Sequence, residues 1–407
     1  MSGNVEDDRF SFSNCTIFTA STGCMNIGFD AKRAFHNGTG LGHYSRSLLQ
    51  SLSDYYPEHQ YYLFNPKPGS FTVNGSKLEE VLPAGWLSKL FSSAWRSSWV
   101  KKDLLRLKIG LYHGLSHEIP IGIRQTGIKS VVTIHDLIHE RYPEQYNAID
   151  VKIYQRKFRY ACDQADRVIA ISEQTKRDII EFYKIPAEKI TVCYQSCNPA
   201  FGITVSEEEK RKVKERYGLP EQFFLSVGSV IERKNLLNSC KAIFLLRNEM
   251  DIPLVVIGDG GKYKQQVKDF VLQNGLEKKV IFLSEKPSAR SSASFKSAAD
   301  FPAIYQSATA MIYPSFFEGF GIPVLEALWS RLPVITSDAS CLPEAGGDGA
   351  FYVNPASAED IATGMKKIVS DKKFAADMIE KGWAHAQKFS PQQCAEAIMN
   401  VYKGIMQ

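Results

Sequence analysis

Short apolar segments alternate with stretches of helical periodicity along this chain, and the alternation occurs in two successive series. The first series predicts strands at 26–30, 110–113, 130–134, 167–171 and, last, 189–194. The second series predicts strands at 223–227, 253–257, 279–283, 309–313 and 333–336. Strands that alternate with helices form parallel sheets covered on both faces. The pattern therefore predicts an α/β fold built from two doubly wound, Rossmann-like domains.

A chain of 407 residues is too long for one hydrophobic core, which agrees with two domains. We place the first domain at residues 25–202 and the second at 203–387, with a terminal helix at 388–407. Residues 1–24 are an extension before the fold, because their apolar stretch is too short for a signal peptide. Two such domains facing each other would bind ligands in the cleft between them, at the carboxyl ends of both sets of strands.

Charge, cysteine content and hydropathy limit what the protein can bind and where in the cell it is expected. The net charge of +5 is small for this length and does not imply a nucleic-acid partner. Its basic excess lies in the first half of the chain, which favours an anionic surface or acceptor there. The eight cysteines are scattered, without the paired spacing of a zinc site, and are expected to be reduced cytoplasmic thiols. No apolar run approaches the ~20 residues that span a bilayer.

The most informative motif begins at Tyr313 and contains Glu318 and, eight residues later, Glu326. Glycines between the two allow a ligand to approach the backbone, and Pro323 suits the first turn of a helix. The amides around Gly321 and Ile322 would then be free donors for a diphosphate or a sugar hydroxyl. The alternative is that Glu318 caps the helix and Glu326 is a solvated surface residue.

This segment resembles family 4 of the retaining glycosyltransferases, whose E-x7-E motif matches Glu318 to Glu326 with the family's usual Gly-Phe-Gly-Ile-Pro context. The resemblance extends over nearly the whole chain from Met25 and implies the two-domain GT-B fold, in which the terminal helix at 388–407 packs back on the first domain. It also implies that Glu318 contacts hydroxyls of the transferred sugar and Glu326 holds the nucleotide ribose. The donor would lie against the intervening loop, formed by Gly319, Phe320, Gly321 and Ile322.

A second motif runs from Phe224 through Gly228 and Ser229 to Arg233 and Lys234. Two cations at the mouth of a sheet would stabilise the charge that develops on a departing diphosphate. Many family members have an arginine where this chain has Ser229, so the resemblance carries phosphate binding to Lys234 more directly than to Arg233. Without the resemblance, such a pair in a loop is usually a solvated feature.

The first domain contributes a glycine-rich loop and a histidine. Gly40 and Gly42 follow the first predicted strand, where the family has the loop that lies under the diphosphate and acceptor. His135 ends another strand, and the resemblance places it beside the donor sugar; the alternative is a structural histidine. Asp136 would either orient His135 or reach the acceptor.

Three more polar residues follow strands in this domain. His113 and His117 either form the acceptor-side wall or are structural. A zinc site is not expected, because no third ligand is evident beside these two histidines. Ser172 is expected to cap a helix.

The resemblance implies a hexosyltransferase that acts by same-face substitution without a metal ion or other cofactor. We expect cell-surface polysaccharide synthesis, with a nucleotide sugar as donor, GDP-mannose as the first choice, and a glycan or lipid-linked saccharide as acceptor. The alternatives are a related epimerase or hydrolase of nucleotide sugars, or a non-catalytic glycan-binding module.

The stretch from Trp86 to Lys108 alternates tryptophans with basic residues. Aromatic rings and cations of this kind favour the headgroup region of an anionic bilayer, which predicts peripheral contact with the cytoplasmic face of a membrane. The alternative is that the tryptophans are core residues and the cations a solvated face.

Overall fold

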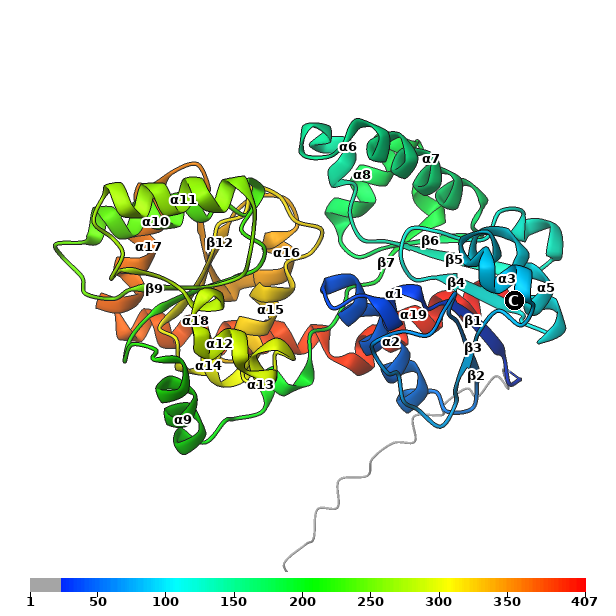
Figure 1. Cartoon of the computed structure of the whole chain (residues 1–407), viewed down its shortest axis with the longest axis horizontal. Coiled ribbons are helices and arrows are strands. Elements are labelled where there is room, and N and C mark those ends of the chain that lie inside the picture. The colour runs from blue at the N-terminus through cyan, green and yellow to red at the C-terminus, as the bar shows by residue number, and fades with distance from the viewer. Residues whose placement is uncertain (1–22) are drawn as a thin grey trace, which may run out of the picture.

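The computed structural model describes residues 23–407, so the predicted extension at 1–24 lies outside the described residues except for its last two. The described chain forms two α/β lobes, each built on one parallel sheet (Figure 1). The α/β prediction of two doubly wound units is confirmed. Within residues 23–407, no helix has the length and apolar character needed to cross a bilayer.

The sheet of the first lobe has seven strands in the order β3-β2-β1-β4-β5-β6-β7, all parallel. Its strands are β1 (Asn26–Asp30), β2 (Gln60–Phe64), β3 (Leu78–Val81), β4 (Leu111–Gly114), β5 (Lys129–Ile134), β6 (Arg167–Ala170) and β7 (Ile190–Val192). The five predicted strands are confirmed. Strands β2 and β3 were not predicted. Strand β3 is the edge strand and buries only its last residue fully, whereas β2 pairs with β1 and β3 and is mostly buried.

The sheet of the second lobe has six parallel strands in the order β10-β9-β8-β11-β12-β13. They are β8 (Phe224–Val227), β9 (Leu254–Ile257), β10 (Val280–Phe282), β11 (Ala310–Tyr313), β12 (Val334–Ser337) and β13 (Ala350–Val353). The five predicted strands are again confirmed, and the edge strand β13 is the addition.

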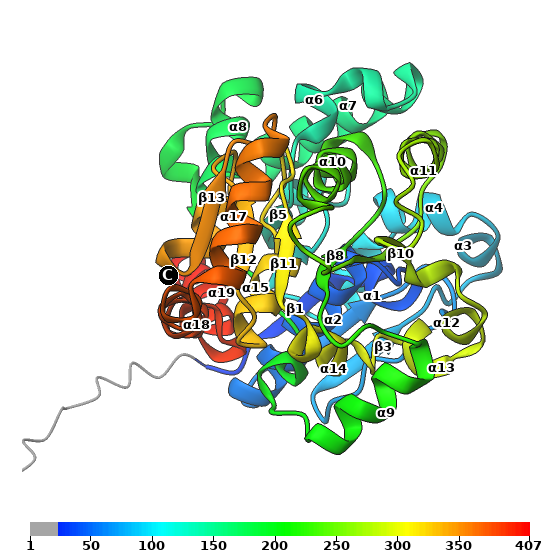
Figure 2. The same cartoon turned by 90° about the vertical axis from the view of Figure 1, so that its left-hand side faces the viewer.

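Helices cover both faces of each sheet, as Figure 2 shows for the second lobe. Those of the first lobe are α1 (Lys32–His36), α2 (Gly40–Tyr55), α3 (Trp86–Leu90), α4 (Ser92–Ala94), α5 (Lys101–Arg106), α6 (Ile138–Arg141), α7 (Ala148–Gln164) and α8 (Glu173–Tyr183). Those of the second lobe are α9 (Glu207–Tyr217), α10 (Leu236–Leu246), α11 (Lys262–Gln273), α12 (Pro287–Ser291), α13 (Ala293–Lys296), α14 (Phe301–Ser307), α15 (Ile322–Trp329), α16 (Leu342–Gly346), α17 (Ala358–Ser370) and α18 (Lys372–Ala386).

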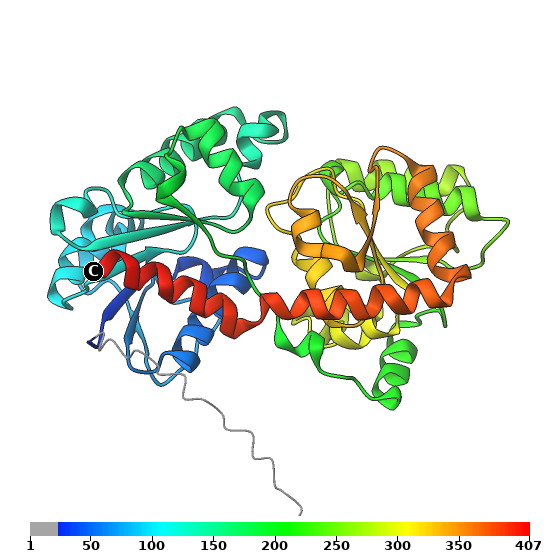
Figure 3. The ribbon, with the colours of Figure 1, turned by 180° about the vertical axis from the view of Figure 1, so that it is seen from behind.

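The last helix, α19 (Pro391–Met406), leaves the second lobe and lies along the first (Figure 3). It packs on α2, and its buried face shares a core with Leu48, Leu49 and Leu52. The Tyr402 hydroxyl lies 2.6 Å from Nδ1 of His113 in β4. Residues close to the end of the chain therefore complete the core of the lobe that begins it.

Candidate functional site

A cavity of about 1180 Å³ lies between the two lobes and is lined by residues that follow strands of both sheets. This is the position at which doubly wound folds bind ligands. The predicted site residues that line it are Gly40, His135, Ser229, Arg233, Lys234, Glu318, Gly319, Phe320, Gly321, Ile322 and Glu326.

Gly42 is the predicted site residue that does not line the cavity. It lies in the first turn of α2, where a Cβ atom would meet the Asn37 carbonyl oxygen at 1.8 Å. Its amide donates to the carbonyl oxygen of Thr39. Gly42 thus allows the turn that starts the helix, while Gly40 faces the cavity.

The Glu318 carboxylate is paired with both predicted cations. Its Oε2 atom lies 2.9 Å from Nη1 of Arg233, and its Oε1 atom lies 3.5 Å from Nζ of Lys234. Burial opposes ionisation of Glu318, but Lys234 and Arg233 together outweigh it and lower its pKa to about 2. Two cations and one anion leave this end of the cavity with a net positive charge. The Glu318 carboxylate is bound to these cations and makes no capping hydrogen bond to α15, so the helix-cap alternative is wrong.

The loop that carries Glu318 is held by neighbouring side chains. Tyr313 and Ser315 both donate hydrogen bonds of 2.9 Å to Oε1 of Glu318. Asn235, in a left-handed conformation with φ of 60°, donates to the Pro314 carbonyl oxygen at 3.0 Å. Asn235 directly follows the two cations in sequence, so it fixes their loop and the Glu318 loop to each other.

Glu326 occupies the second turn of α15 and is buried at the cavity wall. Its Oε2 atom accepts a 2.8 Å hydrogen bond from the Tyr305 hydroxyl. Burial raises the pKa of Glu326 to about 7, although the bond from Tyr305 opposes the shift. The surface-residue alternative for Glu326 is therefore wrong.

The start of α15 presents free donors to the cavity. Gly321, with φ of 109°, is the residue before the helix, and its carbonyl oxygen accepts from Val324 and Leu325. Among residues 23–407, the amides of Gly321 and Ile322 make no backbone hydrogen bond. Free amides at a helix start favour an anion or hydroxyl oxygen.

His135 forms the opposite wall, at the end of β5. Its Nε2 atom lies 2.9 Å from the Leu115 carbonyl oxygen, which can only accept, so Nε2 carries the proton. Burial lowers the His135 pKa to about 4, so the ring is neutral at pH 7. Its Nδ1 atom is left as an acceptor. Asp136 makes its side-chain hydrogen bond to the amide of Ile138 and therefore does not orient His135.

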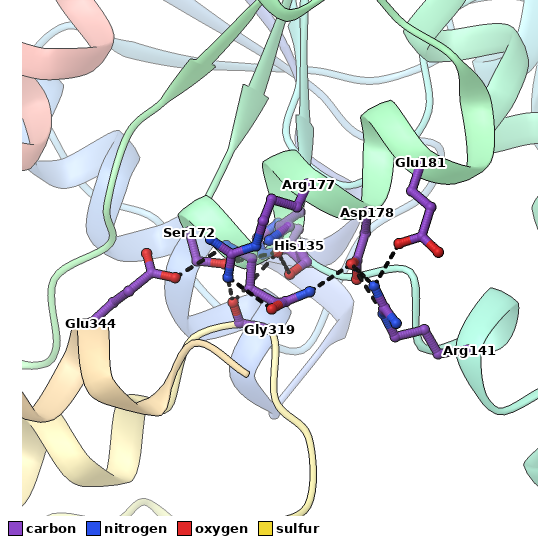
Figure 4. A network of polar contacts seen from close by, with 10 residues as sticks. His135, Arg141, Ser172, Arg177, Asp178, Glu181, Gly319 and Glu344 are labelled. Atoms are coloured by element: carbon purple, nitrogen blue, oxygen red, sulfur yellow. Dashed lines mark hydrogen bonds and ion pairs between the residues drawn. The ribbon is translucent and has the colours of Figure 1, made fainter. Parts of the chain in front are cut away.

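The two lobes touch beside His135. Ser172 caps α8 as predicted, since its Oγ accepts from the Thr175 amide at 3.0 Å. The same hydroxyl donates to the Gly319 carbonyl oxygen at 2.8 Å across the cleft (Figure 4). A Cβ atom at Gly319 would approach the His135 carbonyl oxygen to 2.4 Å, so glycine permits this contact.

A second contact between the lobes is made by Glu344 of α16. Its two carboxylate oxygens accept from the amides of Glu173 (2.7 Å) and Gln174 (3.1 Å) at the start of α8 (Figure 4). A carboxylate at a helix N-terminus is stabilised by the partial positive charge there. Glu344 therefore adds two acceptors from the second lobe to the local cap that Ser172 provides.

His113 and His117 do not line the cavity. His113 is buried between the Tyr402 hydroxyl and the Thr133 hydroxyl, which lies 2.8 Å from its Nε2 atom. The His117 ring stacks on Phe158 with centroids 4.1 Å apart. The acceptor-wall interpretation is wrong for both, and the structural one holds. No group of three or more possible metal ligands occurs among the described residues.

The stretch from Trp86 to Lys108 divides into buried and exposed parts. Trp95 is buried and donates from its ring nitrogen to Asp103, and Arg96 is bound to Asp30 and Glu118. The prediction that these two residues face a membrane is therefore wrong. The exposed apolar residues are Trp86, Leu87, Leu90, Phe91, Trp99 and Leu105.

Several residues that support the cavity wall or join the lobes were not singled out from the sequence. Tyr313, Ser315 and Tyr305 hold the two glutamates, and Glu344 joins the lobes. Tyr313 and Ser315 lie inside the recognised motif, so closeness to Glu318 was an available signal. Tyr305 and Glu344 carried no sequence signal of this kind.

Two family models match the chain. Residues 207–385 match the glycosyl transferases group 1, and residues 39–201 match glycosyltransferase family 4. O-antigen chain mannosyltransferase B of Escherichia coli is 27% identical over 311 residues, which are 76% of this chain and 77% of that protein. O-antigen chain mannosyltransferase RfbU of Salmonella typhimurium is 28% identical over 351 residues, which are 82% of this chain and 88% of that protein.

Solved structures share the fold at lower identity. Sucrose-phosphate synthase from Thermosynechococcus elongatus has a TM-score of 0.73 at 18% identity, covering 94% of this chain and 99% of that one. Anabaena HepE in complex with UDP has a TM-score of 0.69 at 16% identity, covering 94% and 100%. The GT-B prediction for the fold is confirmed.

Proposed function

The chain belongs to glycosyltransferase family 4, and on this premise we propose that it transfers a hexose with retention of configuration. The donor is a nucleotide diphosphate sugar and the acceptor a glycan or lipid-linked saccharide of a surface polysaccharide. The observation that carries the proposal is the arrangement of Arg233 and Lys234 around Glu318 at the cavity wall.

Charge balance supports a diphosphate beside these two cations. Burial disfavours the charged form of Lys234, but Glu318 outweighs burial and keeps its pKa raised. The two cations exceed the single carboxylate by one positive charge, which a departing diphosphate would offset. The free amides of Gly321 and Ile322 add donors for phosphate or sugar oxygens.

The remaining roles are those that the family resemblance implies for residues that line the cavity. Glu326 accepts hydrogen bonds from the ribose hydroxyls, and Glu318 accepts them from hydroxyls of the transferred sugar. Neutral His135 offers its Nδ1 atom as an acceptor to the same sugar. Gly40, Ser229, Gly319 and Phe320 form the surrounding wall. Positioning and charge stabilisation then supply the catalysis, while the leaving phosphate takes the acceptor's proton.

Mannose is the proposed sugar and GDP-mannose the proposed donor. Two relatives in O-antigen synthesis are named mannosyltransferases, which supports the sugar. The fold neighbour HepE was solved with UDP, so UDP-sugars belong in the same test.

A donor screen by thermal shift tests the proposal, because a ligand that binds only the folded protein raises its melting temperature. GDP-mannose is expected to raise it in the wild type and to fail in Lys234→Ala. Absence of a shift with GDP-, UDP- and dTDP-sugars would reject the nucleotide site. Sugar release from the bound donor at equal rates with and without glycan acceptors would indicate a hydrolase instead.

The partner proposal includes contact with the cytoplasmic face of a membrane, now limited to the exposed apolar residues of the first lobe. Trp86 is 73% exposed and Leu90 68% exposed, and both belong to α3. Lys89 belongs to the same helix, and Lys101 and Lys102 begin α5. Apolar side chains beside cations suit an anionic leaflet, where a lipid-linked acceptor would be within reach.

A further inference from the structure

A continuous chain of buried hydroxyl and imidazole groups runs from the terminal helix α19 to α2. The Tyr402 hydroxyl lies 2.6 Å from Nδ1 of His113, whose Nε2 atom lies 2.8 Å from the Thr133 hydroxyl. The Thr133 hydroxyl in turn lies 3.2 Å from the Tyr44 hydroxyl. These four side chains come from α19, β4, β5 and α2.

The groups in this chain are neutral and buried. Burial, with a smaller contribution from His135, lowers the His113 pKa to about 3. A neutral imidazole has one donor and one acceptor nitrogen, so His113 can donate to one hydroxyl and accept from the other. Every polar group is then satisfied within a low-dielectric interior, where such networks are rigid.

This row of four hydrogen-bonded side chains ends against His135. The Tyr44 ring meets the His135 ring edge to face, with centroids 4.6 Å apart and planes at 87°. Tyr44 also lines the cavity. With Nε2 of His135 held by the Leu115 carbonyl oxygen, contact with Tyr44 leaves the imidazole little freedom to turn.

We propose that Tyr44 is a positioning residue for His135, and that Thr133, His113 and Tyr402 hold Tyr44 in place. Helix α19 then helps to fix the direction in which Nδ1 of His135 faces the cavity. The proposal rests on the proposed function for its kinetic consequence, but not for its structural one.

Deletion of single hydroxyl groups tests the role of these four side chains. Tyr402→Phe, Thr133→Val and Tyr44→Phe each remove one hydroxyl and keep the bulk of the side chain. We expect each to lower kcat roughly three- to tenfold with little change in donor KM, because small misplacements of a catalytic group mainly affect the transition state. Tyr44→Phe combined with Tyr402→Phe should cost no more than the larger single effect, because both act through one network.

Tyr61→Phe is the matched control. Tyr61 is also buried in the first lobe, and its hydroxyl lies 3.0 Å from the Leu52 and 2.7 Å from the Tyr56 carbonyl oxygen, outside the chain. This variant should lower the melting temperature as Tyr402→Phe does and leave kcat unchanged. Equal kinetic behaviour of Tyr61→Phe and Tyr402→Phe would overturn the proposal.

A second measurement separates this proposal from the proposed function. In ¹⁵N-labelled protein without donor, His135 should show the neutral tautomer protonated at Nε2. Its ring signals should shift or broaden in Tyr402→Phe and Tyr44→Phe but not in Tyr61→Phe. Unchanged His135 signals in both chain variants would overturn the positioning role, whether or not a sugar donor is found.

Discussion

The Nη1 atom of Arg233 lies 2.9 Å from the Oε2 atom of Glu318, although 85 residues separate them in the chain. Both side chains are nine-tenths or nearly nine-tenths buried, so each depends on the other for a counter-charge. The pair belongs at once to the proposed reaction and to the stability of the second lobe.

We therefore expect Glu318→Ala to destabilise the protein by about 3–5 kcal/mol, because it leaves the buried cations Arg233 and Lys234 without their counter-charge. Denaturant unfolding of the purified variant measures this. The control is Glu380→Ala, which removes an exposed partner of Arg331 and should change little. Equal stability of Glu318→Ala and the wild type would show that the pair is unimportant to the fold.

Glu326 should make stability depend on pH. Its pKa is about 7 in the folded protein, against an ordinary value of 4.5. Between pH 4.5 and pH 7, Glu326 is protonated in the folded protein but ionised in the unfolded chain. The stability that this proton contributes is therefore fully present below pH 4.5 and is lost as the pH rises through 7. Glu326→Gln, neutral at every pH, should remove that decline from melting curves, whereas Glu380→Gln should not. An unaltered decline in Glu326→Gln would contradict the prediction.

Gly319→Ala tests how closely the lobes must approach. The new methyl group would meet the His135 carbonyl oxygen at 2.4 Å, so the Glu318 loop must move away from the first lobe. We expect kcat/KM to fall roughly 10- to 100-fold, because displacement of about 1 Å is costly at a reacting centre. The control is Gly404→Ala, where a Cβ atom meets nothing within 4 Å. Wild-type turnover with Gly319→Ala would show that the contact is dispensable.

Transfer should survive chelation. In the proposed site, Arg233, Lys234 and the free amides would stabilise the leaving group in place of a divalent ion, so an excess of EDTA should leave the rate of sugar transfer unchanged. The anomeric configuration of the product, followed by NMR, should match that of the donor. Activity lost on chelation and restored by magnesium or manganese would contradict the metal-free proposal.

Vesicle sedimentation tests the membrane surface. Trp86→Ala with Leu90→Ala should weaken binding to anionic vesicles, and salt should weaken it further, because both apolar and charged groups contribute. The matched control is Leu272→Ala, which alters an exposed leucine of the second lobe. Equal recovery of the wild type in the supernatant with and without vesicles would reject the surface.

The sequence predicted most of the strands that form continuous apolar runs, and missed the partly buried edge strands β3 and β13. It also missed β2, although Tyr61, Leu63 and Phe64 are buried there. Strand β3, Leu-Glu-Glu-Val, is mostly exposed at its edge and carries no apolar run. His113 was ambiguous because position after a strand does not say which way a side chain points. Its partner Tyr402 lies 289 residues away.

The candidate site shows the same division. The spacing of Glu318 and Glu326 predicted their common cavity, since one loop and one helix turn separate them. The partner of Glu326 was not predictable, because Tyr305 comes from α14. Arg96 looked like a surface cation within a basic stretch, yet it is bound by Asp30 from β1, 66 residues earlier.

Helix α19 has a consequence for the order in which the protein is made. The first lobe is synthesised first, but Ala395, Ile398, Met399 and Tyr402 belong to its core. During synthesis, the apolar face of the first lobe that α19 covers therefore stays exposed until the whole second lobe has been made. Contacts of such long sequence separation form slowly and leave an intermediate open to aggregation. A truncation just before Ala395 would remove these four residues from the core of the first lobe, although it would remove no residue that lines the cavity.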